Sequence, residues 1–235
     1  TMVNDSLVQI SQDARGVVRL TLNDPQRFNA LSAEMLTALQ TALDAVAKDE
    51  SVRVVVLAGE GKAFCAGHNL KDMAANPELS YYQQLFAQCS RVMLSIQKLP
   101  VPVIARVHGI ATAAGCQLVA QCDLAVASED ARFVTSGIQY GLFCSTPSVP
   151  LVRNMPIKQA MQMLLTGEFI DANTAMQYGL LNRVVPVDQL DAAVEELVAA
   201  IVSKPRVAIR MGKELVYRQR EMGLEPAYHL AGQTM

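Results

Sequence analysis

Long apolar runs and strong net charge are both missing from the sequence, and each absence excludes a class of protein. No stretch reaches the roughly 18 consecutive apolar residues that a membrane-spanning helix requires, so we expect no membrane span. The formal net charge is −2, too small to attract nucleic acid, so we expect no nucleic-acid partner. The opening TMVNDSLVQI is too polar for a signal peptide and lacks the arginine-rich pattern of a transit peptide. We therefore expect a cytoplasmic protein, or one of the mitochondrial matrix if the source is eukaryotic and the chain is processed.

Metal and cofactor motifs are missing as well. The five cysteines, at positions 65, 89, 116, 122 and 144, are odd in number and no two have CxxC spacing, which argues against a zinc site and a disulfide framework. We interpret them as reduced cysteines. The chain contains neither G-x-G-x-x-G nor a Walker A sequence, so a dinucleotide site and a P-loop have no support. We expect no metal ion and no permanently bound cofactor.

The chain does contain enough apolar sequence for one large buried core. Its 235 residues are 51% hydrophobic and 18% charged, a globular profile. Apolar patterning predicts strands over 17–22, 52–57, 103–107 and 181–185, and helices over 33–48, 81–98, 157–166, 172–178, 188–202 and 207–220. Residues 74–80 have little periodicity and predict a mobile loop. Strand, strand, helix recurs about four times before the final helices, an α/β order that fits neither a doubly wound sheet nor an eight-fold barrel.

Two turns are built almost entirely from small residues. AFCAG at 63–67 precedes a polar segment, and ATAAG at 111–115 opens a short helix. A bare backbone ahead of a helix lets a ligand press against unpaired N–H groups. Close packing of the backbone explains either turn alone. The amides at the start of the helix after the second turn are predicted to form half of an oxyanion hole.

Four segments carry a resemblance to a known family. They read NDPQRFNALS at 23–32, AFCAGHNLKDM at 63–73, HGIATAAGCQLVAQCDLAVAS at 108–128 and GEFIDANTAMQYGLLNRVV at 167–185. In this order they resemble the crotonase (enoyl-CoA hydratase/isomerase) superfamily over nearly the whole chain. Within it, ATAAGCQL, GLFCSTP and the Gly67-His68 pair are similar to the enoyl-CoA hydratase domain-containing protein 3 group.

The resemblance implies a fold, an assembly and a substrate class. Residues 1–187 are expected to form a crotonase-like spiral core of ββα turns that carries an acyl-CoA site. Residues 188–235 are expected to form a helical region that drives trimerisation, often into hexamers, and the family's last helix is not visible in a chain that ends at Met235. The implied partners are an acyl-CoA thioester, with coenzyme A as part of the substrate, and further copies of the chain.

The resemblance also implies the residues of the site. In the family two backbone N–H groups hold the thioester carbonyl, and these fall on Ala66 and Ala114. Hydratases of the family use two glutamates to position a water and exchange protons with it, and their positions are taken here by Gln117 and Gly137. Glutamine can hydrogen-bond a water but cannot take its proton, and glycine has no side chain. The expected protein stabilises a thioester enolate in fatty acid metabolism, with weak or no standard hydratase activity.

Basic residues are expected beside the phosphates of CoA. Arg27 matches the family's basic position, with a plain surface cation as the alternative, and Lys71 is the next candidate. Lys213 is a further one that would reach a phosphate across a subunit boundary. The family's adenine pocket lies around the first small-residue turn and implicates Ala66, His68, Asn69 and Leu70. Asn69 replaces a frequent aspartate there.

Other side chains are candidates for the work of the missing carboxylates. His68 is a candidate base near pH 7, or a residue that lines the CoA cleft or caps a turn. Cys144 is a candidate nucleophile or a buried structural cysteine. Asp72 fits the surface of a helix, and Asp123 fits an anchor at the start of a strand. Two functions stay open: a crotonase-type lyase or isomerase, and a non-catalytic acyl-CoA sensor or assembly subunit.

Overall fold

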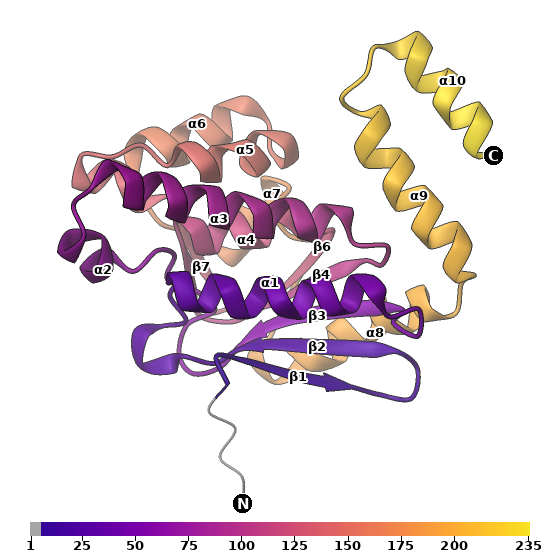
Figure 1. Ribbon diagram of the computed structural model, residues 1–235, viewed down its shortest axis with the longest axis horizontal. Coiled ribbons are helices and arrows are strands. Elements are labelled where there is room, and N and C mark those ends of the chain that lie inside the picture. The colour runs from indigo at the N-terminus through magenta and orange to yellow at the C-terminus, as the bar shows by residue number, and fades with distance from the viewer. Residues whose placement is uncertain (1–5) are drawn as a thin grey trace, which may run out of the picture.

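The computed structural model describes residues 6–235, so the first five residues, which are part of the polar opening segment, lie outside the described chain. Its main sheet has six strands in the order β1-β2-β3-β4-β6-β9 (Figure 1), formed by Val8–Gln12, Val17–Leu22, Val54–Gly59, Val103–Val107, Leu124–Ser128 and Arg183–Val185. β1 and β2 are antiparallel, and every later neighbouring pair is parallel. All four predicted strands lie in this sheet and are confirmed, whereas β1 was not predicted.

Helices cover both faces of the main sheet, and β3 shows why its sequence is continuously apolar. The covering helices are α1, α3 and α8, which span Ala33–Lys48, Leu79–Lys98 and Leu190–Val202. Val55 and Leu57 of β3 belong to the core that includes α1 and α3, and Val54 and Val56 to the core that includes α8. Because side chains alternate along a strand, a strand buried on both faces needs apolar residues at every position.

A second, smaller sheet contains the strand that leads into the second small-residue turn. Its strands β5, β7 and β8 span Ile110–Thr112, Arg132–Val134 and Ile170–Asp171. Cys65 adds an isolated parallel bridge to Ala111 of β5, so the first small-residue turn joins the edge of this sheet. Successive turns of the chain thus place one segment in each sheet before returning through a helix, which is the predicted ββα spiral.

The remaining helices alternate with the strands of the second sheet along the chain. α4, α5, α6 and α7 span Ala114–Gln121, Ser145–Asn154, Ile157–Thr166 and Ala172–Gln177, and short 3-10 turns occupy Pro25–Arg27, Ser136–Tyr140 and Val187–Gln189. The predicted helices 157–166 and 172–178 are confirmed. Gly179 follows α7 with a φ of 94°, a left-handed conformation that glycine adopts without a Cβ clash and that ends the helix.

The prediction of a mobile loop over 74–80 is wrong. A short helix, α2 (Leu70–Ala75), runs into this stretch, and α3 begins at Leu79, so only three residues separate the two helices. Asn69 caps α2, since its side chain accepts hydrogen bonds from the backbone N–H groups of Lys71 and Asp72. The Tyr82 hydroxyl donates to the Met73 carbonyl over 2.9 Å and ties the two helices together. The Asn69 cap and the Tyr82 hydrogen bond thus stabilise helical structure in a segment whose apolar periodicity is weak.

The C-terminal region consists of α8 against the sheet and of α9 (Arg206–Gln219) and α10 (Leu224–Thr234), which extend away from it (Figure 1). α9 confirms the predicted helix 207–220, and α10 was not predicted. α9 is attached to the core by Lys213, which is 7% exposed and forms an ion pair with Asp123 at 2.8 Å. Lys213 also donates to the carbonyls of Ile96 and Val101, each over 2.9 Å.

Candidate active site

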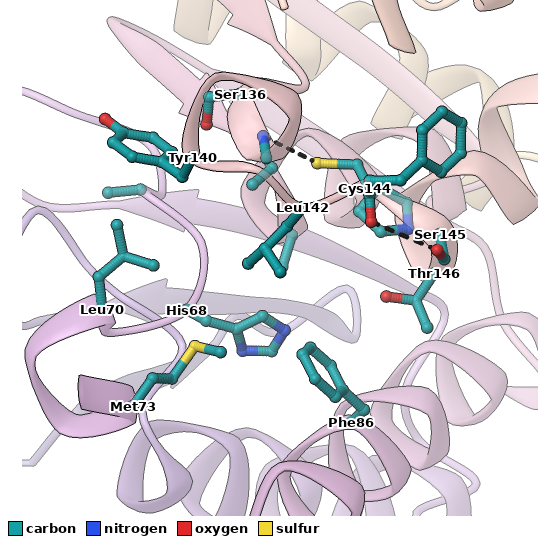
Figure 2. A pocket seen from close by; sticks show the side chains of 16 residues that line it. His68, Leu70, Met73, Phe86, Ser136, Tyr140, Leu142, Cys144, Ser145 and Thr146 are labelled. Carbon is teal, nitrogen blue, oxygen red and sulfur yellow. Dashed lines mark hydrogen bonds between the residues drawn. The ribbon is translucent and has the colours of Figure 1, made fainter. Parts of the chain in front are cut away.

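A mostly apolar cavity of about 410 Å³ lies where the two small-residue turns meet the segment 136–147 (Figure 2). Its lining comes from the first turn and α2, from α3, from the start of α4, and from the 3-10 turn and the beginning of α5. The lining residues are Ala66, His68, Leu70, Met73, Phe86, Ala113, Ala114, Ser136, Gly137, Tyr140, Leu142, Phe143, Cys144, Ser145, Thr146 and Pro147. None of them is an aspartate or a glutamate. The cavity suits an apolar ligand with a few polar atoms.

Ala114 places a backbone donor at this cavity. It is the first residue of α4, so its N–H has no acceptor within the helix, and among residues 6–235 no loop or turn carbonyl accepts from it. Ala113, which precedes it, has a φ of 50°, a conformation that side chains rarely adopt. Two hydrogen bonds hold it there: its N–H donates to the Val134 carbonyl of β7, and its own carbonyl accepts from the Gln117 N–H in the first turn of α4. The helix N-terminus also favours negative charge.

Glycine is required where the two small-residue turns touch. A Cβ built on Gly67 would lie 2.7 Å from the Thr112 carbonyl oxygen and 3.1 Å from the Ala114 nitrogen. A Cβ built on Gly115 would lie 2.0 Å from the Cys65 carbonyl oxygen. Any side chain at either position would push the turns apart. The small residues therefore allow the two turns to pack closely, and they also leave the backbone N–H of Ala114 accessible. The two interpretations of these turns are compatible.

Ala66 also lines the cavity, but its N–H is already engaged. It donates to the Phe28 carbonyl oxygen over 2.9 Å. Phe28 and Asn29 both have left-handed backbones, with φ values of 53° and 54°, which is strained for residues with a side chain. Cys65 adds a bond to the same loop, since its thiol donates to the Asn29 carbonyl over 3.1 Å. The two predicted residues thus line one cavity; the N–H of Ala114 is unpaired, and that of Ala66 is held by the Phe28 carbonyl.

Gly137 lines the cavity beside Cys144. The Gly137 N–H donates to the Cys144 sulfur over 3.3 Å, as the dashed line in Figure 2 marks. A Cβ built on Gly137 would lie 2.9 Å from that sulfur. The thiol therefore fills the space in which a side chain at position 137 would begin. Burial raises the pKa of the Cys144 thiol, so it is protonated at neutral pH.

Gln117 lies one turn into α4 and is not among the residues that line the cavity. Its side chain is 3% exposed, and its Oε1 has no hydrogen-bond partner among the described residues. A buried amide oxygen without a donor is uncommon in folded proteins. The two positions at which the resemblance leads us to expect glutamates thus hold a buried neutral amide and a bare backbone.

His68 and Leu70 line the cavity, and Asn69 between them caps α2. The His68 ring lies among Met73, Phe86 and Leu142 in Figure 2, and it meets the Phe86 ring edge to face at 5.1 Å between centroids. Burial lowers the pKa of His68, so the imidazole is neutral at pH 7. The sequence analysis did not identify Met73, Phe86 or Leu142 as site residues, because an apolar side chain that lines a cavity resembles one in the core.

The basic candidates lie outside the cavity. Arg27 is 67% exposed and sits 3.7 Å from Asp24, and Lys71 is exposed on α2. The structure contradicts the role suggested for Lys213, because its ammonium is buried against Asp123 and cannot reach a phosphate. The anchoring role expected for Asp123 is confirmed: besides Lys213, its carboxylate accepts from the Val103 N–H over 2.7 Å and from the Tyr217 hydroxyl over 2.5 Å.

No metal-binding group of three His, Cys, Asp or Glu side chains is found among residues 6–235. All five cysteines are buried and free. In the same part of the chain, no helix is long and apolar enough to cross a membrane.

Comparison with known proteins gives a consistent family assignment. The family model described as enoyl-CoA hydratase/isomerase matches residues 12–235. The enoyl-CoA hydratase domain-containing protein 3, mitochondrial, of Xenopus laevis is 44% identical over 226 residues, which cover 96% of this chain and 77% of that protein. The human protein of the same name has a crystal structure with 41% identity and a TM-score of 0.94, covering 97% of this chain and 90% of that one.

A crystal structure described as enoyl-CoA hydratase from Mycobacterium smegmatis is more similar still, with 62% identity and a TM-score of 0.96 over 97% of this chain and 89% of that one. The resemblance to the enoyl-CoA hydratase domain-containing protein 3 group and the α/β crotonase fold are both confirmed. The chain therefore belongs to the enoyl-CoA hydratase/isomerase (crotonase) family.

Proposed function

We propose that the cavity binds an acyl-CoA thioester, with the thioester oxygen at the Ala114 N–H and the acyl chain against the apolar lining. One observation carries the proposal: Ala114, the first residue of α4, has an unpaired N–H and lines the cavity. Ala66 lines the same cavity, and most of the other lining side chains are apolar. A carbonyl oxygen that gains negative charge is stabilised there by the donor and by the helix N-terminus. The enoyl-CoA hydratase names of the relatives support this substrate class.

The second oxyanion donor is the Ala66 N–H, which must exchange the Phe28 carbonyl for the thioester oxygen or be shared between them. Phe28 and Asn29 have strained left-handed backbones. When the Phe28 carbonyl gives up its hydrogen bond to Ala66, the loop can relax and this strain is relieved. The CoA portion follows the first turn, along His68, Asn69 and Leu70. Lys71 and Arg27 provide the exposed positive charges for its phosphates. CoA enters and leaves as part of the substrate, and no resident cofactor takes part.

In this proposal the protein acts on thioesters of fatty acid metabolism, but its hydration of an enoyl-CoA is slow or absent. Adding water to the double bond requires one group to remove a proton from water and another to supply one. Among residues 6–235 no aspartate or glutamate lines the cavity, Gly137 has no side chain, and Gln117 cannot exchange a proton. The protein retains the means to stabilise an enolate and lacks the usual groups that complete hydration.

The same observation favours a second candidate function, a non-catalytic acyl-CoA sensor or assembly subunit. Such a protein needs the amide donors and the apolar lining but no proton-transfer group. The two candidates share the binding site and differ in turnover, so a single preparation can distinguish them.

The test combines calorimetry with activity assays. We expect saturated acyl-CoA esters to bind and crotonyl-CoA to be hydrated far more slowly than by a hydratase that carries both glutamates. Binding without turnover on a panel of enoyl, acyl and malonyl thioesters supports the sensor. Robust hydration of crotonyl-CoA overturns the role assigned to Gln117 and Gly137, and a lack of binding overturns the proposal as a whole.

We also propose that the chain assembles as a homotrimer or as a hexamer of two trimers. α9 and α10 extend from the core with exposed apolar side chains, including Val216, Leu224 and Tyr228, and a second copy would cover them. Sedimentation at micromolar concentration should give three or six times the monomer mass, and a monomer would contradict this.

We also propose a location in the cytoplasm, or in the mitochondrial matrix of a eukaryote. The names of the vertebrate relatives support the second location.

A further inference from the structure

Among the described residues that line the cavity, a single side chain, that of His68, can accept a proton at neutral pH. Of its polar lining residues, Ser136, Ser145, Thr146 and Tyr140 present hydroxyl groups, and Cys144 presents a protonated thiol. Hydroxyl groups of serine, threonine and tyrosine do not accept a proton at pH 7. His68 remains, and as a neutral imidazole it has a free lone pair.

The surroundings of His68 determine which nitrogen carries that lone pair. Its Nδ1 lies 3.4 Å from the Leu31 carbonyl oxygen, an acceptor only, so Nδ1 is the nitrogen that carries the hydrogen. Nε2 makes no hydrogen bond within the described chain and is therefore the free acceptor. The Phe86 ring packs edge to face against the imidazole and restricts its rotation. A backbone carbonyl that sets the tautomer of a histidine in this way is a common arrangement around basic imidazoles.

His68 is also close to the proposed oxyanion donors along the chain and in space. It follows Ala66 by two residues on the same turn, and Gly67 between them lies against the Ala114 nitrogen, as the 3.1 Å separation from a built Cβ shows. A thioester carbonyl placed at those amides has its α carbon one bond away from the carbonyl carbon. Proton removal from that carbon places the negative charge on the oxygen that the amides hold.

We propose that His68 is the proton acceptor of this site and that its substrates are acyl-CoA esters with a hydrogen on the α carbon. Nε2 takes the α proton, the electrons of the C–H bond form the enolate, and the charge rests on the thioester oxygen. The imidazolium returns a proton to the same carbon or to a neighbouring position of a conjugated chain. This inference rests on the proposed binding of an acyl-CoA thioester and assigns the residue that would act on it.

Hydrogen exchange at the α carbon tests the inference directly. The protein is mixed with butyryl-CoA in deuterated buffer, and loss of the α-proton signal is followed by NMR. We expect exchange well above the rate without protein, and His68→Gln should lower it by at least about 100-fold, the usual contribution of a general base. His229→Gln, an exposed histidine on α10, is the matched control and should keep the full rate. Calorimetry on each variant shows whether butyryl-CoA still binds.

Chemical rescue separates a proton acceptor from a structural histidine. His68→Ala leaves space for free imidazole, and added imidazole should restore exchange in proportion to its concentration. Exchange by His68→Gln at the wild-type rate overturns the inference, and so does a wild-type protein that binds butyryl-CoA without exchanging its α protons. In both cases the proposed binding function stands. A wild-type protein that does not bind butyryl-CoA contradicts the proposed function itself.

Discussion

The Ala66 N–H donates to the Phe28 carbonyl oxygen over 2.9 Å, although it is the amide expected to hold a thioester oxygen. If the thioester takes this donor, the chemical environment of the Ala66 amide must change on binding. We expect its ¹H–¹⁵N NMR signal to shift when butyryl-CoA is added. CoA with a free thiol occupies the part of the site that binds the CoA portion of the substrate, but it has no thioester carbonyl. It should therefore leave the Ala66 signal nearly unshifted. Equal shifts with both ligands would show that Phe28 keeps the donor.

Gly137 and Cys144 should behave as a coupled pair. A Cβ at position 137 would lie 2.9 Å from the Cys144 sulfur, so Gly137→Ala forces that side chain to move. We expect a loss of about 1–3 kcal/mol in the free energy of unfolding, as overpacking usually causes. Cys144→Ala in the same protein should remove most of that loss, because the sulfur is the group that is displaced. A double-mutant cycle with urea unfolding measures the coupling, and strictly additive losses would contradict it.

The contact between position 137 and the Cys144 sulfur also determines which substitutions could give the protein hydratase activity. Gln117→Glu with Gly137→Glu places carboxylates at the two positions where we expect the family's glutamates, but the second side chain collides with the thiol of Cys144. We expect crotonyl-CoA hydration to appear or rise when Cys144→Ala is added, and to rise less without it. The control is Cys144→Ala alone, which should stay inactive. No gain in the triple variant would mean that the cavity has diverged beyond these three positions.

Gln117→Glu alone should reduce stability in a pH-dependent way. The side chain is 3% exposed, and burial raises the pKa of a carboxyl group. The folded state then binds the proton more tightly than the unfolded state, so the loss is small near pH 4 and grows as the pH rises toward the folded-state pKa. Urea unfolding at pH 5 and pH 8 measures it. Gln117→Met, which cannot ionise, is the control, and its loss should be the same at both pH values.

The Lys213 and Asp123 pair should account for much of the attachment of α9 to the core. Lys213→Ala leaves the Asp123 carboxylate without its cation and two carbonyls without a donor, and we expect a loss of about 3–5 kcal/mol. Arg218→Ala, on the same helix, breaks an exposed pair with Glu214 and should change stability by less than about 1 kcal/mol. Similar effects from both variants in thermal unfolding would contradict the assignment.

Much of the fold could be predicted because it depends on local patterns. The run RVVVLAG predicts a strand buried on both faces, and β3 shows both faces filled by apolar helices. The helix 157–166 is correct to the residue. α10 was not predicted, since its residues have little apolar spacing, and the bounds of α2 were not predicted, since they depend on the Asn69 cap.

The site could be predicted from the sequence only where runs of small residues indicate it. The small residues identify both turns, and they meet at the cavity. No sequence pattern indicates that the Phe28 carbonyl would reach Ala66, that the Cys144 thiol would fill the space beside Gly137, or that Lys213 would turn inward to Asp123. Each of these contacts joins segments that only the folded chain brings together.

The affinity for an acyl-CoA thioester relative to its thioether analogue tests the central claim most directly. The two ligands differ only in the carbonyl oxygen that the Ala114 and Ala66 amides are proposed to hold. Two hydrogen bonds of about 1 kcal/mol each predict that the thioether binds at least about tenfold more weakly in calorimetry. Equal affinities would contradict the account, because the carbonyl would then not be held at the start of α4.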